Sequence, residues 1–75
     1  MAFEIRPTED LVRIMAAGGG FRINAEARAS SDLVRIATAA VKGGGQLALI
    51  GMNTRRIEDI VDIALAGKGH VSFED

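Results

Sequence analysis

Hydrophobic and polar residues follow two alternating rhythms along this chain. Residues 21–24, 46–50 and 70–73 alternate between apolar and polar side chains, which is typical of strands with one exposed face. Before each of these stretches, apolar residues recur every three or four positions, as they do in an amphipathic helix. Residues 2–6 also alternate and precede the first helical stretch. The pattern therefore predicts the element order β-α-β-α-β-α-β.

The helical stretches are near-copies of one another. Asp10–Ile14 reads DLVRI, Asp32–Ile36 repeats these letters, and Asp59–Ile63 reads DIVDI. Self-similarity at a period of roughly 25 residues is typical of stacked helix–strand units. In such a stack, Arg35 and Asp62 occupy matching positions and are placed to pair between neighbouring helices. We predict one domain, in which strand 2–6 is followed by three helix–strand units, residues 7–26, 29–51 and 53–75.

Capping residues predict where the helices begin. Thr8 and Ser30 each precede a helical stretch, and we expect each to be an N-cap, because a hydroxyl there accepts a hydrogen bond from a first-turn amide. The matching position of the third unit is Ile57, which has no hydroxyl. We therefore expect the third helix to begin earlier, with Asn53 or Thr54 as its cap. The residues of this helix expected to face inward are Ile57, Ile60, Val61 and Ala64.

The polarity of the strands predicts how the layers are arranged. Strands with one polar face have helices on the other face only. Right-handed crossovers that all lie on one face must step in one direction along the sheet. We therefore predict an α/β fold with a four-stranded parallel sheet in the order 1-2-3-4 and three helices on one face. Two alternatives stay open: an order such as 2-1-3-4 with helices on both faces, and a chain-swapped dimer.

In outline, this predicted fold resembles a short arc of a leucine-rich-repeat solenoid, although the Leu and Asn consensus spacing of that family is absent. The DLVRI segments and their glycine-rich turns, Gly18–Gly20 and Gly43–Gly45, also resemble small bacterial α/β-repeat proteins of unknown function. The resemblance spans the whole chain. It implies a fold and brings no activity with it.

Composition narrows the classes of function. The chain has 75 residues, a formal net charge of −1 and no cysteine, so it contains neither disulfides nor a thiolate metal site. His70 is the only histidine, and we predict no metal and no cofactor. Because a signal peptide and an apolar run of about 20 residues are lacking, we expect a cytoplasmic protein without a membrane contact. Near-neutral charge and the lack of stacking aromatic residues argue against nucleic-acid binding.

Arginines gather where the predicted strands lead into the helices. Ligands of open parallel sheets bind beyond the carboxyl ends of the strands, and helix N-termini there favour anions. A phosphate or carboxylate ligand is therefore one hypothesis for this rim. By contrast, the triple glycines follow helix C-termini, so we interpret them as turns and not as phosphate loops. The candidate anion-binding residues are Arg6, Arg28, Arg55 and Arg56.

The outer face of the predicted sheet is the second candidate site. Its polar positions surround a small apolar spot at Ala48 and Ile50. Repeat proteins use extended sheet faces of this kind to bind partners. The candidate partner-binding residues are Arg22, Asn24, Ala48, Ile50, His70 and Ser72.

No constellation of side chains predicts catalysis. Ser72 is the nearest hydroxyl to His70 on the same strand face, and a lone pair of this kind does not define a nucleophile and base. We therefore predict a non-enzymatic interaction module that binds a protein or peptide through its open sheet face or an edge strand. An edge strand could also form a homodimer. Binding of a small anion at the arginine rim is the alternative.

Overall fold

Helices and strands alternate along the part of the chain that the structure, a computed structural model, describes, residues 6–74. Each helix leads through a glycine-containing turn into a short strand, so the helix–strand unit recurs as the sequence pattern predicts. The elements are α1 (Thr8–Ala16), β1 (Phe21–Asn24), α2 (Ser30–Gly43), β2 (Leu47–Ile50), α3 (Ile57–Gly67) and β3 (Val71–Glu74).

The described strands form a parallel sheet in the order β1-β2-β3. Leu49 lies opposite Ile23 on one side and Phe73 on the other. The α/β class and the stepwise order of these strands are confirmed. In the alternative order 2-1-3-4, the strand predicted at residues 2–6 would lie between β1 and β2. This alternative is wrong, because β1 pairs directly with β2. The strand predicted at residues 2–6 lies outside the described residues except for Arg6, which lies in a bend.

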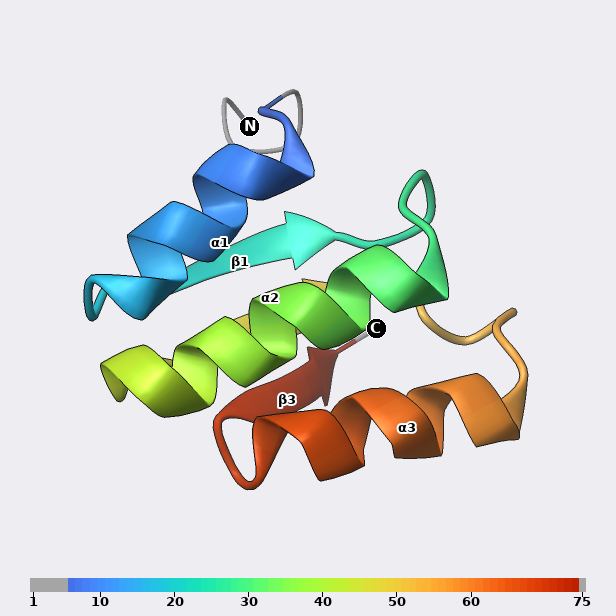
Figure 1. Ribbon diagram of the computed structural model, residues 1–75. Coiled ribbons are helices and arrows are strands. Elements are labelled where there is room, and N and C mark those ends of the chain that lie inside the picture. Colours follow the sequence, from blue (N-terminus) through green and yellow to red (C-terminus); the bar gives the residue numbers. More distant parts are fainter. Residues whose placement is uncertain (1–5, 75) are drawn as a thin grey trace.

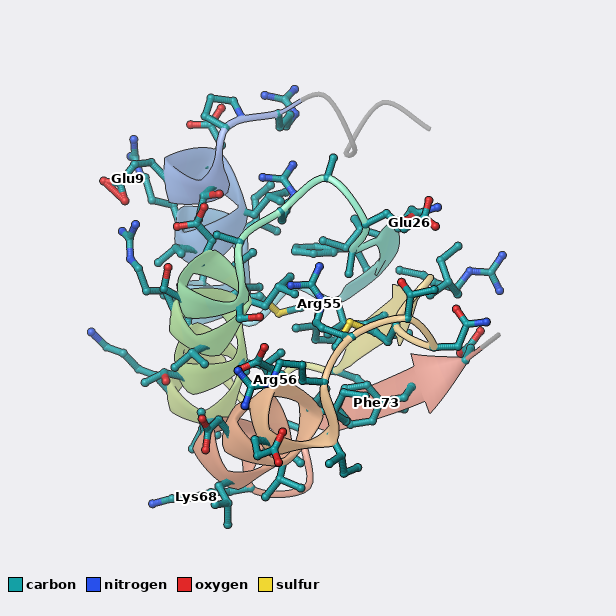
Figure 2. All side chains as sticks on the ribbon, turned by 90° about the vertical axis from the view of Figure 1, so that its right-hand side faces the viewer. Glu9, Glu26, Arg55, Arg56, Lys68 and Phe73 are labelled. Carbon is teal, nitrogen blue, oxygen red and sulfur yellow. The ribbon has the colours of Figure 1, made fainter. Side chains whose placement is uncertain are left out.

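All three helices cover the same face of the sheet (Figure 1). Viewed from the side, they form one layer and the strands form the other (Figure 2). Between the layers lies an aliphatic core that includes Leu33, Ile36 and Leu49, each fully buried. Among residues 6–74, no helix combines the length and the apolar character that crossing a membrane would require.

The ends of α1 and α2 approach each other closely because glycines leave room for the backbone. A Cβ atom on Gly43 would overlap with the carbonyl oxygen of Met15. The next residue, Gly44, ends α2 in the left-handed conformation, with φ of 78°. The glycine-rich turns therefore end helices, as predicted, and also let neighbouring helices pack against each other.

The helix starts differ from the prediction. Thr8 and Ser30 are the first helical residues and not the N-caps, which are Pro7 and Ala29 and make no side-chain capping bond. The third helix begins at Ile57 and not earlier. The hydroxyls of Thr8 and Ser30 instead accept hydrogen bonds from distant arginines, described below.

Helix α3 turns only part of its predicted side toward the core, since Ile60 packs against the core as predicted and Ala64 is exposed. Ile63 is its buried apolar side chain, whereas Ile57 is 64 % and Val61 46 % exposed. Val12 and Val34, which match Val61 on α1 and α2, are partly buried against the core. The difference arises because α3 is the last helix, so no further helix among the described residues covers this side.

Candidate functional site

Two arginines tie successive loops of the rim together. The guanidinium group of Arg28 donates to the carbonyl oxygen of Arg6 at 2.6 Å and to the hydroxyl of Thr8 at 3.0 Å. In the next unit, Arg55 donates to the carbonyl oxygen of Arg28 at 2.9 Å and to the hydroxyl of Ser30 at 2.9 Å. The same pair of contacts is therefore made twice, one unit apart.

Arg55 makes one further contact, which places it deep in the rim. It donates to the carbonyl oxygen of Ala25, directly after β1, at 2.6 Å. The side chain is partly buried and lies near the centre of the rim in Figure 2. One guanidinium group thus joins the end of a strand to the start of the following helix.

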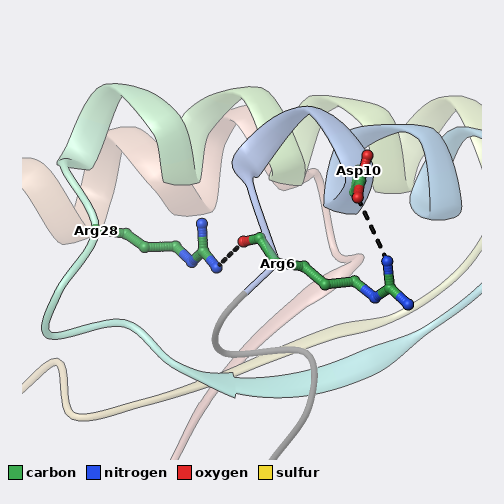
Figure 3. A network of polar contacts seen from close by, with 3 residues as sticks. All are labelled: Arg6, Asp10 and Arg28. Atoms are coloured by element: carbon green, nitrogen blue, oxygen red, sulfur yellow. Dashed lines mark hydrogen bonds and ion pairs between the residues drawn. The ribbon is translucent and has the colours of Figure 1, made fainter.

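The other two arginines of the rim pair with carboxylates. Arg6 lies 3.4 Å from Asp10, one turn into α1 (Figure 3). Arg56 lies 3.4 Å from Glu58, and both side chains are mostly exposed. Exposed ion pairs of this kind contribute about 0–1 kcal/mol to folding.

These contacts form a series that we call the arginine ladder, in which Arg28 and Arg55 each hold the loop of the preceding unit and Arg6 supplies the first acceptor. Its members Arg6, Arg28 and Arg55 all lie two residues before a helix start. The structure brings these three together in series and leaves Arg56 beside Glu58. The recurrence of arginine at this position, with a hydroxyl two residues later in two units, was the signal in the sequence. Anion binding at the rim stays a prediction.

The outer face of the sheet is crossed by an ion pair. Arg22 on β1 lies 3.2 Å from Glu74 on β3, so the pair spans the width of the described sheet. Between these strands lie Ala48 and Ile50, both partly exposed. The predicted apolar spot is therefore present on this face, with a charged bridge from one flanking strand to the other.

Two of the three remaining candidates of this face, Asn24 and His70, take part in local contacts. Asn24 accepts a hydrogen bond from the backbone amide of Glu26 at 2.9 Å and so shapes the turn after β1. His70 Nδ1 lies 2.8 Å from the carbonyl oxygen of Gly45, so this nitrogen carries the donated hydrogen. Ser72 is partly exposed on β3. Partner binding through these residues stays a prediction.

The largest exposed apolar side chains gather elsewhere, at the C-terminal end of the stack. Ile57, Val61 and Leu65 recur every four residues on α3, and Leu65 is 68 % exposed. Phe73 on β3 is 38 % exposed and lines a hollow together with Met52 and Ile60. We call these residues, with the outer edge of β3, the C-terminal end surface: Ile57, Val61, Leu65 and Phe73. The sequence pattern does not predict this surface, because a periodic apolar stripe is expected to face the core.

Comparisons and composition add little chemistry to this geometry. The chain matches no protein-family model, no curated protein and no solved structure. Within residues 6–74, no three side chains of the His, Cys, Asp and Glu types cluster as a metal site would require. The function must therefore be inferred from the surfaces of the molecule.

Proposed function

We propose that this chain is a small, non-enzymatic interaction module that binds a protein or peptide through its C-terminal end surface. The observation that carries the proposal is that all four of the large apolar side chains found exposed in residues 6–74, Ile57, Val61, Leu65 and Phe73, belong to α3 and β3. Single exposed apolar residues are ordinary, whereas a contiguous group indicates an interaction site.

The geometry of this surface suits two kinds of contact at once. The stripe on α3 offers apolar side chains one helical turn apart, which is how a helix packs against another element. Beside it, β3 is an edge of the described sheet, since only β2 pairs with it. Edge strands present backbone groups that an added strand can bond.

The outer sheet face is the weaker of the two protein-binding surfaces. Its central side chains, Ala48 and Ile50, are only partly exposed, and the bridge from Arg22 to Glu74 crosses beside them. A partner would have to displace this ion pair or accommodate it. The arginine rim is weaker still as a ligand site, because Arg28 and Arg55 already donate to oxygens of the chain itself.

Selection from a displayed library of random peptides tests the proposal. The expected result is that peptides selected on the wild-type protein lose most of their binding to Leu65→Glu, because a charge would have to be buried in the contact. Leu65 is 68 % exposed, so this change affects folding little. Ile50→Glu on the outer sheet face is the matched control and should retain binding. Peptides that bind Leu65→Glu normally but not Ile50→Glu would contradict the proposal and favour the sheet face.

A further inference from the structure

The two ends of the helix layer expose residues that match the two halves of the contact between α1 and α2. Where α1 meets α2, Val12 and Ala16 of α1 border a groove opposite Arg35 and Ala39 of α2. An ion pair between Glu9 of α1 and Arg35 of α2 closes this contact on the outside. In this contact, α1 therefore offers a receiving side, with an acid and small apolar residues, and α2 offers a docking side, with an arginine.

The docking side recurs on α1 itself, where it faces outward. Arg35 and Ala39 lie on this side of α2, and Asp32 and Ile36 precede them by three residues and so share their face of the helix. One unit earlier in the chain, 22 positions back, the matching residues are of the same four types: Asp10, Arg13 and Ile14 of α1, and Ala17, its C-cap. These four and Arg6 line a hollow at the N-terminal end of the stack.

The receiving side recurs on α3. Val12 and Ala16 of α1 correspond to Val61 and Leu65, and the acid Glu9 corresponds to Glu58. In α1, this side is partly buried beside α2, whereas in α3 it is the exposed stripe of the C-terminal end surface. On α3 this side carries one larger apolar side chain than on α1, because Leu65 stands at the position of Ala16.

We infer that the partner of the C-terminal end surface is a second copy of this chain, whose α1 docks on α3 as α2 docks on α1. The inference rests on the proposed function, because it names the partner of that surface. In this arrangement, Arg13 of the second copy pairs with Glu58, as Arg35 pairs with Glu9. Contacts between two different sides of a molecule are heterologous, so copies add head to tail.

In the arginine ladder, too, each hydrogen bond runs from one unit to the unit before it. Arg28 donates to the Arg6 carbonyl, and Arg55 donates to the Arg28 carbonyl. The next acceptor in this series is the carbonyl of Arg55, and the next donor is Arg6 of the second copy. Because Ile57 stands where Thr8 and Ser30 have hydroxyls, this joint makes one hydrogen bond fewer.

Charge reversal at the two ends tests the inference. Sedimentation of the wild-type chain from about 10 µM to about 1 mM should show a mass that rises beyond that of a dimer. Arg13→Glu and Glu58→Arg should each weaken association about tenfold or more, because each places like charges face to face. An equimolar mixture of the two variants should associate again, because every joint then pairs opposite charges.

Two controls separate this contact from net charge. Lys42→Glu changes the charge of the chain as Arg13→Glu does, and Glu26→Arg changes it as Glu58→Arg does. Both residues are exposed, Lys42 beside the groove between α1 and α2 of one molecule, and neither lies on the sides of α1 and α3 that meet between copies, so association should persist. In the wild type, the amide signals of residues 10–17 and 57–65 should shift together on dilution, a measurement that needs no variant.

Other outcomes overturn the inference. A wild-type chain that stays monomeric at the highest concentration excludes the second copy, while peptide selection still tests the proposed function independently. Association that stops at a dimer and ignores Arg13→Glu indicates that two α3 helices meet through their own stripes, and it excludes head-to-tail docking. If the Leu65→Glu variant still binds the selected peptides, the proposed function is wrong.

Discussion

Arg55 shows how one side chain can hold several segments in place. Its guanidinium group donates to the carbonyl oxygens of Ala25 and Arg28 and to the hydroxyl of Ser30. Arginine suits this position because its planar fork offers five N–H donors and stays charged at every physiological pH. The neighbouring Arg56 has the same chemistry but lies on the surface, paired with Glu58.

This contrast predicts unequal effects of the same substitution. Arg55→Met should lower the free energy of unfolding by about 2 kcal/mol, because three oxygens lose a charged donor in a partly buried site. Arg56→Met should change it by less than about 0.5 kcal/mol, because an exposed ion pair contributes little. Urea unfolding followed by circular dichroism measures both. Equal effects of the two changes would mean that the contacts of Arg55 do not support the fold.

At the scale of elements, local patterns predicted most of the architecture. The alternating stretches at 21–24 and 46–50 are strands within one residue, and the DLVRI segments are helices on one face of a parallel sheet. These features follow from the spacing of apolar residues, which is a local property of the sequence. The strand predicted at residues 2–6 lies outside the described residues except for Arg6.

The errors of prediction at this scale have a common cause. Thr8 was assigned as a cap because hydroxyls near helix starts commonly cap, yet its partner is Arg28, 20 positions away. Arg35 was expected to pair with Asp62 and instead pairs with Glu9 on the opposite neighbour. Ile57 and Val61 were placed inside because periodicity shows which side of a helix is apolar, but not whether anything covers it. All three depend on distant residues.

The contact between α1 and α2 supplies a prediction about glycine. Gly43→Ala should destabilise the fold by about 3 kcal/mol, because the added methyl group overlaps with the Met15 carbonyl and forces the helices apart. Gly44→Ala should cost about 1 kcal/mol, since nothing lies within 4 Å of its added Cβ and only the left-handed backbone opposes it. Thermal unfolding compares the two. If Gly44→Ala is the more harmful, backbone conformation and not helix packing limits this turn.

At the scale of the whole molecule, stability should be highest in the middle of the stack. Helix α2 has neighbours on both sides and five buried residues, whereas α1 and α3 have two each. Repeat stacks gain stability from the contacts between neighbouring units, so terminal units open more readily.

Hydrogen exchange can show this gradient directly. Amides of α2 and β2 should exchange most slowly, and those of α3 should exchange faster by about tenfold or more, since a 1.4 kcal/mol difference in opening free energy is a factor of ten. The measurement is best made on a dilute sample, so that contacts between molecules do not protect α3. Protection of α3 equal to that of α2 in such a sample would contradict the gradient.

The arginine ladder also sets the order in which its hydrogen bonds can form while the chain is being synthesised. In both rungs the acceptors come first in the sequence, and the donor follows, Arg28 after Arg6 and Thr8, and Arg55 after Arg28 and Ser30. Protein synthesis runs from the N-terminus, so each loop waits for only one further unit to leave the ribosome before its arginine can reach it. The stack can therefore be fastened unit by unit as it emerges.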